Sequence, residues 1–132
     1  MIGIIVMTHG NLGRELINSS ELIVGKTENV TSLSLAREDN IDMLSEKFLD
    51  VLKQYETCDD ILVFADLLGG SPCNVASAHL RNKHTYQVIT GANLPMLLEA
   101  IMSRDFCSIE ELVEKCLIAA KDGTCHVNKM MK

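Results

Sequence analysis

Residues 61–72 read ILVFADLLGGSP, and the fold can be inferred outward from this stretch. The apolar run Ile61–Ala65 is typical of a strand that is covered on both faces of a parallel sheet. The carboxylate of Asp66 follows it directly. Gly69-Gly70 then precedes Ser71-Pro72, a pair that favours the N-terminus of a helix. The stretch therefore predicts a buried strand that leads through a glycine loop into a helix.

Three further runs are predicted as strands: Ile2–Met7, Val30–Leu35 and Tyr86–Thr90. The run Ile2–Met7 is almost wholly apolar, as expected of a central strand. The run Val30–Leu35 alternates leucine with serine, which indicates a strand nearer an edge of the sheet.

Helical periodicity separates these strands. The stripe that follows the first strand consists of Leu12, Leu16 and Ile23, with a helix start at about Asn11, and the stripe that follows the second consists of Ile41, Leu44, Phe48, Leu52 and Tyr55. A capping box at Ser108–Glu111 predicts the start of a last helix, which should end at Gly123. Thr124–Asn128 is predicted as a short final strand.

The alternation of strands and helices predicts an α/β fold with an open, doubly wound, mainly parallel sheet and helices on both faces. A strand order of 2-1-3-4 would place a topological switch between the first and third strands. Ligands in such sheets bind beyond the carboxyl ends of the strands at that switch. We expect a single domain over residues 1–132.

The composition excludes several classes of function. With 47% apolar and 23% charged residues, the chain has the composition of an ordinary globular domain. Its net charge of −6 disfavours binding to nucleic acid or to an anionic membrane. Five cysteines without metal-ligand spacing predict neither disulfides nor a metal site, which fits the cytoplasm. The apolar N-terminus is too short for a signal peptide or a membrane span.

An imidazole and a carboxylate are expected to meet at the switch, because His9 ends the first strand and Asp66 ends the third. Histidine is a competent nitrogen nucleophile, and a carboxylate on one ring nitrogen leaves the other free to attack. Glycine loops and helix N-termini suit phosphate oxygens. The predicted site has His9 as nucleophile and Asp66 as its partner, with Thr8, Gly10, Gly69, Gly70 and Ser71 on the phosphate and Leu68, Asn93 and Pro95 lining it.

Each feature also has a purely structural interpretation. His9 alone could be a turn residue, Asp66 a loop carboxylate and Ser71 a helix cap. A thiol in the first turn of a helix, such as Cys73, could be reactive. We expect His79, His84 and His126 at the surface, and Met96, Leu97, Leu98, Ile101 and Met102 in the core or in a subunit interface. No nucleotide-binding motif is present.

Three segments together resemble the enzyme IIA component of the mannose-type (mannose/fructose/sorbose) sugar phosphotransferase system. They are IIVMTHG at 4–10, DLLGGSPCN at 66–74 and TGANLPML at 90–97. The resemblance departs from the family at Leu68 and Cys73, where members often carry aromatic residues. These two positions flank the loop and leave the partner and the sugar open.

The resemblance implies a cytoplasmic phosphocarrier that needs no cofactor. His9 matches the histidine that the family phosphorylates on Nε2, Asp66 matches its paired carboxylate, and Ser71 matches a serine of the phosphate loop. Such proteins accept the phosphoryl group from HPr and pass it to a IIB component, and they reach the membrane only through IIC and IID. The family forms homodimers in which a C-terminal strand crosses to the partner's sheet, a role that would suit Thr124–Asn128.

Two other functions remain open at this point. A phosphotransfer subunit that feeds a dihydroxyacetone kinase begins with a similar domain, although its loop differs from the Gly-Gly-Ser-Pro found here. Alternatively, the domain could be a regulatory binding module whose phosphorylation state is sensed by another protein.

Overall fold

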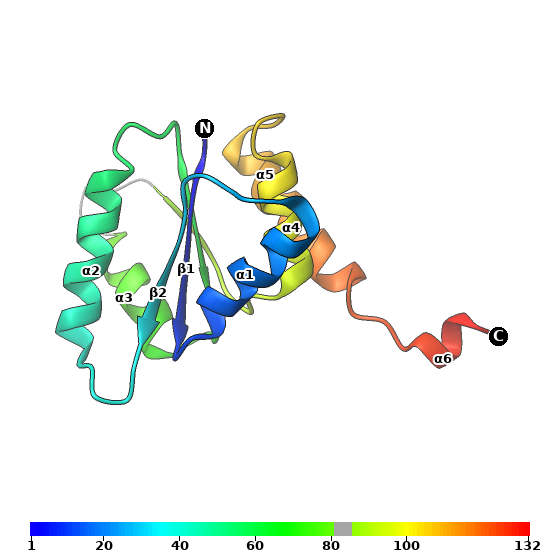
Figure 1. The fold of residues 1–132 in the computed structure, drawn as a ribbon, viewed down its shortest axis with the longest axis horizontal. Helices are drawn as coiled ribbons and strands as arrows, with labels where there is room; N and C mark the ends of the chain where they lie inside the picture. Colours follow the sequence, from blue (N-terminus) through cyan, green and yellow to red (C-terminus); the bar gives the residue numbers. More distant parts are fainter. Residues whose placement is uncertain (81–85) are drawn as a thin grey trace.

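A four-stranded parallel sheet forms the centre of this computed structural model, which describes residues 1–80 and 86–132 (Figure 1). The strands are β1 (Gly3–His9), β2 (Val30–Leu35), β3 (Ile61–Ala65) and β4 (Gln87–Ile89). The helices are α1 (Leu12–Val24), α2 (Ile41–Gln54), α3 (Ser71–His79), α4 (Leu94–Ser103), α5 (Ile109–Asp122) and α6 (Val127–Met130). The prediction for His84 lies outside the described residues.

The strand order is β2-β1-β3-β4 with every pairing parallel, so the predicted order and its switch point are confirmed. The register pairs Met7 with Ala65 and His9 with Leu35. β1 therefore extends two residues further than predicted, because Thr8 and His9 still pair with β2. This register brings His9 and Asp66 to the same edge of the sheet, at the carboxyl ends of β1 and β3.

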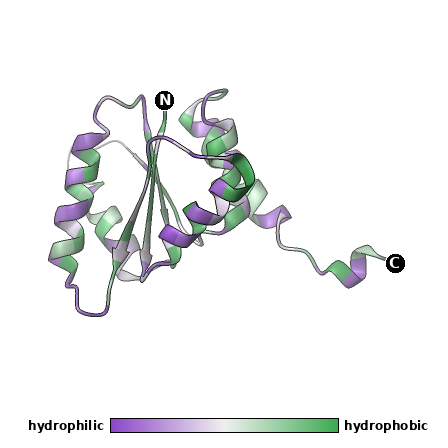
Figure 2. Cartoon of the chain, in the orientation of Figure 1, coloured by the Kyte–Doolittle hydropathy of each residue, from purple (hydrophilic) through white to green (hydrophobic). Residues whose placement is uncertain are grey.

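Each face of the sheet carries its own apolar core, and the central strands between the two cores are hydrophobic (Figure 2). One core joins the sheet to α1, α4 and α5 and contains the buried Met96, Leu97 and Leu112. The other joins it to α2 and α3 through Leu44, Phe48 and Val75. β1 and β3 contribute alternate residues to both cores, which explains why their sequences are apolar without alternation.

The predicted stripe of α1 is wrong at two of its three positions, since only Leu16 packs against the core. Leu12 and Ile23 are exposed, and the face toward the sheet is formed by Gly13, Ile17 and Ser20. A Cβ atom at Gly13 would lie 3.1 Å from Val6, so the helix crosses β1 too closely for large side chains. Two of the three buried residues are small, so a pattern of large apolar residues does not reveal the buried face of this helix.

Several smaller predictions can also be compared with the structure. In α2 the predicted stripe is buried except for Ile41, and the capping box of α5 forms between Ser108 and Glu111. His79 is half-buried rather than superficial, because its Nε2 lies 2.7 Å from Ser45 Oγ. His126 is exposed, as is Met102.

The predicted C-terminal strand is not formed in the single chain. Residues 124–126 have no regular structure, and Val127–Met130 forms the short helix α6 (Figure 1). A strand needs a neighbour to accept its hydrogen bonds, and this segment runs away from the sheet. In the part of the chain that the structure describes, no helix has the length and apolar character needed to cross a membrane.

Candidate functional site

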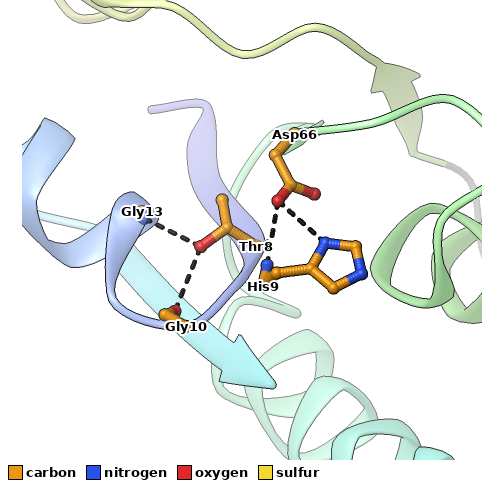
Figure 3. A network of polar contacts seen from close by, with 5 residues as sticks. All are labelled: Thr8, His9, Gly10, Gly13 and Asp66. Atoms are coloured by element: carbon orange, nitrogen blue, oxygen red, sulfur yellow. Dashed lines mark hydrogen bonds and ion pairs between the residues drawn. The ribbon is translucent and has the colours of Figure 1, made fainter. Parts of the chain in front are cut away.

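The side chains of His9 and Asp66 meet at the carboxyl ends of β1 and β3 (Figure 3). Oδ2 of Asp66 lies 2.9 Å from Nδ1 of the imidazole and also accepts a hydrogen bond of 2.9 Å from the backbone N–H of His9. Oδ1 is buried and has no hydrogen-bond partner among the described residues. One carboxylate oxygen thus fixes both the backbone and the ring of His9.

This pairing determines which ring nitrogen can react. An ionised carboxylate only accepts hydrogen bonds, so the proton of the neutral imidazole lies on Nδ1. The lone pair is then on Nε2, on the side of the ring away from Asp66 (Figure 3). The His9 side chain is 48% exposed, which makes Nε2 accessible to a macromolecular partner. Geometrically the pair is a nucleophile with an orienting carboxylate.

Thr8 and Gly10 build the turn that follows His9 and do not face a ligand. Thr8 is fully buried, and its hydroxyl accepts a hydrogen bond from Gly13 N at 2.8 Å and donates to Gly10 O at 3.3 Å. The N–H of Gly10 donates to Leu35 O. Their polar groups are used within the turn and at the start of α1, which disfavours the predicted contact of these two residues with phosphate.

Replacement of Thr8 by valine should destabilise the protein. The substitution keeps the shape of the side chain but leaves the buried N–H of Gly13 without an acceptor, which costs about 1–3 kcal/mol. We expect the midpoint of denaturant unfolding to fall accordingly. The exposed Thr57 provides the matched control, since Thr57→Val should leave the midpoint unchanged. Equal midpoints for Thr8→Val and the wild type would contradict this role of Thr8.

The glycine loop after β3 packs against the imidazole. Gly69 has φ +81°, a left-handed conformation that favours glycine. The N–H of Gly70 donates to Leu67 O at 3.1 Å and closes the turn. A Cβ atom at Gly70 would lie 2.8 Å from His9 Cε1, so only glycine allows the loop to approach the ring this closely. The loop therefore borders the ring at Cε1, the carbon between Nδ1 and Nε2.

The N-terminus of α3 begins at this loop. Gly70, and not Ser71, is the N-cap residue, and no side chain caps the helix. Within residues 1–80 and 86–132, no hydrogen bond is found for the backbone N–H groups of Gly69 and Ser71. Free N–H groups at a helix N-terminus favour an anion. Of the five residues predicted to bind phosphate, these two have N–H groups available for that purpose.

Of the three residues predicted to line the site, one is exposed on the glycine loop and two have contacts within the fold. Leu68 is 78% exposed on the glycine loop. Asn93 is the N-cap of α4 and accepts a hydrogen bond from Met96 N, and Pro95 packs against Gly123 at the end of α5. The latter two therefore have structural roles. Cys73 is buried in the first turn of α3, which disfavours a redox function.

Asn74 is a residue of the site that the sequence did not indicate as functional. Its side-chain amide donates to Gly69 O at 3.1 Å, and its backbone N–H donates to Gly70 O at 2.9 Å. Its place five residues after a loop glycine could have indicated this contact. Within the described ranges, no three His, Cys, Asp or Glu side chains are close enough together to hold a metal ion.

The site can be compared with known proteins. Residues 3–117 match the family model described as "PTS system fructose IIA component". The chain belongs to this enzyme IIA family. It is 36% identical over 123 residues to the mannose-specific EIIAB component of Escherichia coli, with 92% of this chain covered. The chain spans only 38% of the length of that relative. It is 29% identical to the fructose-specific EIIA component of Bacillus subtilis, over 86% of this chain and 77% of the relative.

Solved enzyme IIA structures share the whole architecture. The phosphotransferase component EIIA of Streptococcus agalactiae superimposes with a TM-score of 0.90 at 31% identity, over 98% of this chain and 99% of that one. The mannose/sorbose-specific IIA subunit of Enterococcus faecalis gives a TM-score of 0.84 at 30% identity, over 94% and 92%. The predicted resemblance to the mannose-type enzyme IIA family is thus confirmed, and so is the predicted α/β fold.

Proposed function

We propose that this enzyme IIA protein is a phosphocarrier of sugar uptake, in which His9 accepts a phosphoryl group from HPr and passes it to a IIB component. The observation that carries the proposal is the bond between His9 Nδ1 and Asp66 Oδ2, which leaves Nε2 as the nucleophile. The free N–H groups of Gly69 and Ser71 lie in the loop that borders the ring. Membership of the enzyme IIA family supports the same donor and acceptor.

The transfer moves one phosphoryl group between two imidazoles. The lone pair of His9 Nε2 attacks the phosphorus of phospho-HPr, and the N–P bond to the donor breaks as the new one forms. The donor imidazole recovers its electron pair. The phosphorylated ring of His9 gains positive charge, which the carboxylate of Asp66 balances through the proton that stays on Nδ1. The step needs neither a nucleotide nor a metal ion.

The partners meet the site at the exposed end of the sheet. His9 is half-exposed and Leu68 stands beside it on the glycine loop, so a second protein can reach Nε2 without any opening of this chain. The membrane is involved only through the IIC and IID components. We place this role in the cytoplasm, where the five free cysteines would stay reduced.

Phosphorylation followed by discharge tests this function. The purified chain is incubated with phosphoenolpyruvate, enzyme I and HPr, and the phosphoprotein is then mixed with a mannose-type IIB protein. We expect one acid-labile phosphoryl group per chain, which moves to IIB and does not move to dihydroxyacetone kinase subunits. Failure to incorporate phosphate would contradict the carrier function. Incorporation without discharge to IIB would favour the regulatory module.

We also propose that the protein is a homodimer in which the segment Thr124–Asn128 pairs with the partner's β4. β4 is an edge strand, and a cavity of about 720 Å³ between its end and α5 is lined by Met96, Leu117 and Ile118. The segment itself extends away from its own sheet (Figure 1). An added antiparallel strand would cover both the open edge and the cavity.

The dimer can be tested by removal of this segment. Light scattering should give twice the chain mass for the full chain, and a variant that ends at Gly123 should be a monomer. A variant that ends at Met130 keeps the segment and should remain a dimer. The proposal fails if the full chain is a monomer at micromolar concentration or if removal of residues 124–132 leaves the dimer intact.

A further inference from the structure

Among the described residues, one side chain bonds to the glycine loop beside His9, that of Asn74 in the first turn of α3. Two consecutive carbonyl groups of the loop bond to this residue, since Gly69 O accepts from Nδ2 at 3.1 Å and Gly70 O accepts from the backbone N–H at 2.9 Å. The backbone bond is the ordinary first bond of a helix. The side-chain bond is additional and depends on an amide at position 74.

With this side-chain bond, both polar groups of one peptide unit are hydrogen-bonded. The peptide between Gly69 and Gly70 has its carbonyl bonded to Asn74 and its N–H bonded to Leu67 O at 3.1 Å. A planar peptide that is bonded at both ends cannot rotate. Without Asn74 it would be bonded at one end only, next to Gly69 at φ +81° and a second glycine, where the chain has the greatest conformational freedom.

This peptide is also the one that contacts the nucleophile. A Cβ atom at Gly70 would lie 2.8 Å from His9 Cε1, the ring carbon that is bonded to both Nδ1 and Nε2. The N–H groups on either side, those of Gly69 and Ser71, have no hydrogen bond among the described residues. If this peptide is released, Gly69 ψ and Gly70 φ can change independently, and such a change reorients the two flanking peptides that carry these N–H groups. Donors that are already oriented stabilise transferred charge without reorganisation.

We propose that Asn74 is a positioning residue for phosphoryl transfer, which fixes the Gly69–Gly70 peptide beside His9 so that the loop N–H groups face the phosphoryl oxygens. The inference rests on the proposed carrier function. Asn74 lies beyond the loop from the imidazole and touches it only through the glycines. Its effect should therefore be on the maximal rate of transfer and not on the affinity for phospho-HPr.

Two substitutions test this role, because Asn74→Ala removes the side chain and Asn74→Leu keeps its length without a donor. For both we expect a maximal rate of transfer from phospho-HPr about tenfold lower, with KM for phospho-HPr changed less than twofold, as follows from loss of one hydrogen bond that orients the site. The matched control is Asn18→Ala, an exposed helical asparagine on α1 that should transfer at the wild-type rate.

A second measurement does not depend on phosphorylation. Backbone ¹⁵N relaxation should give rigid order parameters for residues 69–71 in the wild type and lower ones in both Asn74 variants, with melting temperatures close to that of the wild type. Unchanged order in the variants would overturn the inference, and so would a raised KM with an unchanged maximal rate. A wild-type chain that accepts no phosphoryl group would contradict the carrier function instead, while the order parameters would still decide whether Asn74 holds the loop.

Discussion

Replacement of His9 by alanine should abolish phosphorylation of the chain by phospho-HPr. The reason is chemical, because Nε2 of His9 is the nitrogen left with a lone pair by the bond from Nδ1 to Asp66. The side chain is 48% exposed and packs in neither core, so its removal should leave the fold intact. The measurement is incorporation of labelled phosphate from phosphoenolpyruvate in the presence of enzyme I and HPr.

Two control variants make this result specific. His126→Ala removes an exposed imidazole from the C-terminal segment, and Cys73→Ser removes the thiol at the start of α3. Both should be phosphorylated like the wild type. If His9→Ala incorporated as much phosphate as the wild type, the assignment of the nucleophile would be wrong. Loss of phosphorylation in Cys73→Ser alone would favour thiol chemistry.

Asp66→Ala should slow transfer by roughly 10²- to 10⁴-fold, the range seen when the group that orients a catalytic histidine is removed. Three effects combine in this variant. The imidazole loses the bond that keeps the proton on Nδ1, its ring becomes free to rotate, and the charge of the phosphorylated ring is no longer balanced. The rate should be measured by rapid quench with phospho-HPr as donor.

The same variant should remain folded. Asp66 lies at the end of β3 and bonds only to His9 among the described residues, and its Oδ1 has no hydrogen-bond partner there. Asp50→Ala, on the exposed face of α2, changes the net charge equally and should transfer at the wild-type rate. A rate for Asp66→Ala within twofold of the wild type would exclude the carboxylate from the mechanism.

The sheet could be predicted from the sequence because its strands carry strong local signals. Val30–Leu35 and Ile61–Ala65 have the predicted bounds, and the predicted order 2-1-3-4 is one of those that right-handed crossovers allow. The buried face of α1 and the conformation of the C-terminal segment could not be predicted from local patterns. α1 buries Gly13 and Ser20 because it approaches β1 closely, and the C-terminal segment has no strand partner in the single chain.

The chemistry of the site could be predicted from the sequence, but several of its hydrogen bonds could not. Strand ends brought His9 and Asp66 together as expected, since their positions follow from the sheet alone. The roles of Thr8 and Gly10 could not be foreseen, because a hydroxyl or N–H near a site can equally bond within the turn. Asn74 was missed for the converse reason, because its contact with Gly69 depends on the exact turn that the glycines form.

The most direct test of His9 as the phosphocarrier residue is to identify the atom that carries phosphorus. The phosphorylated chain with ¹⁵N-labelled histidine is examined by NMR at alkaline pH, where phosphohistidine persists, and the coupling between ³¹P and the ring nitrogens is recorded. We expect the coupling to be to Nε2 of His9, with Nδ1 still protonated beside Asp66. Coupling to Nδ1, or to a nitrogen of another histidine, would contradict it.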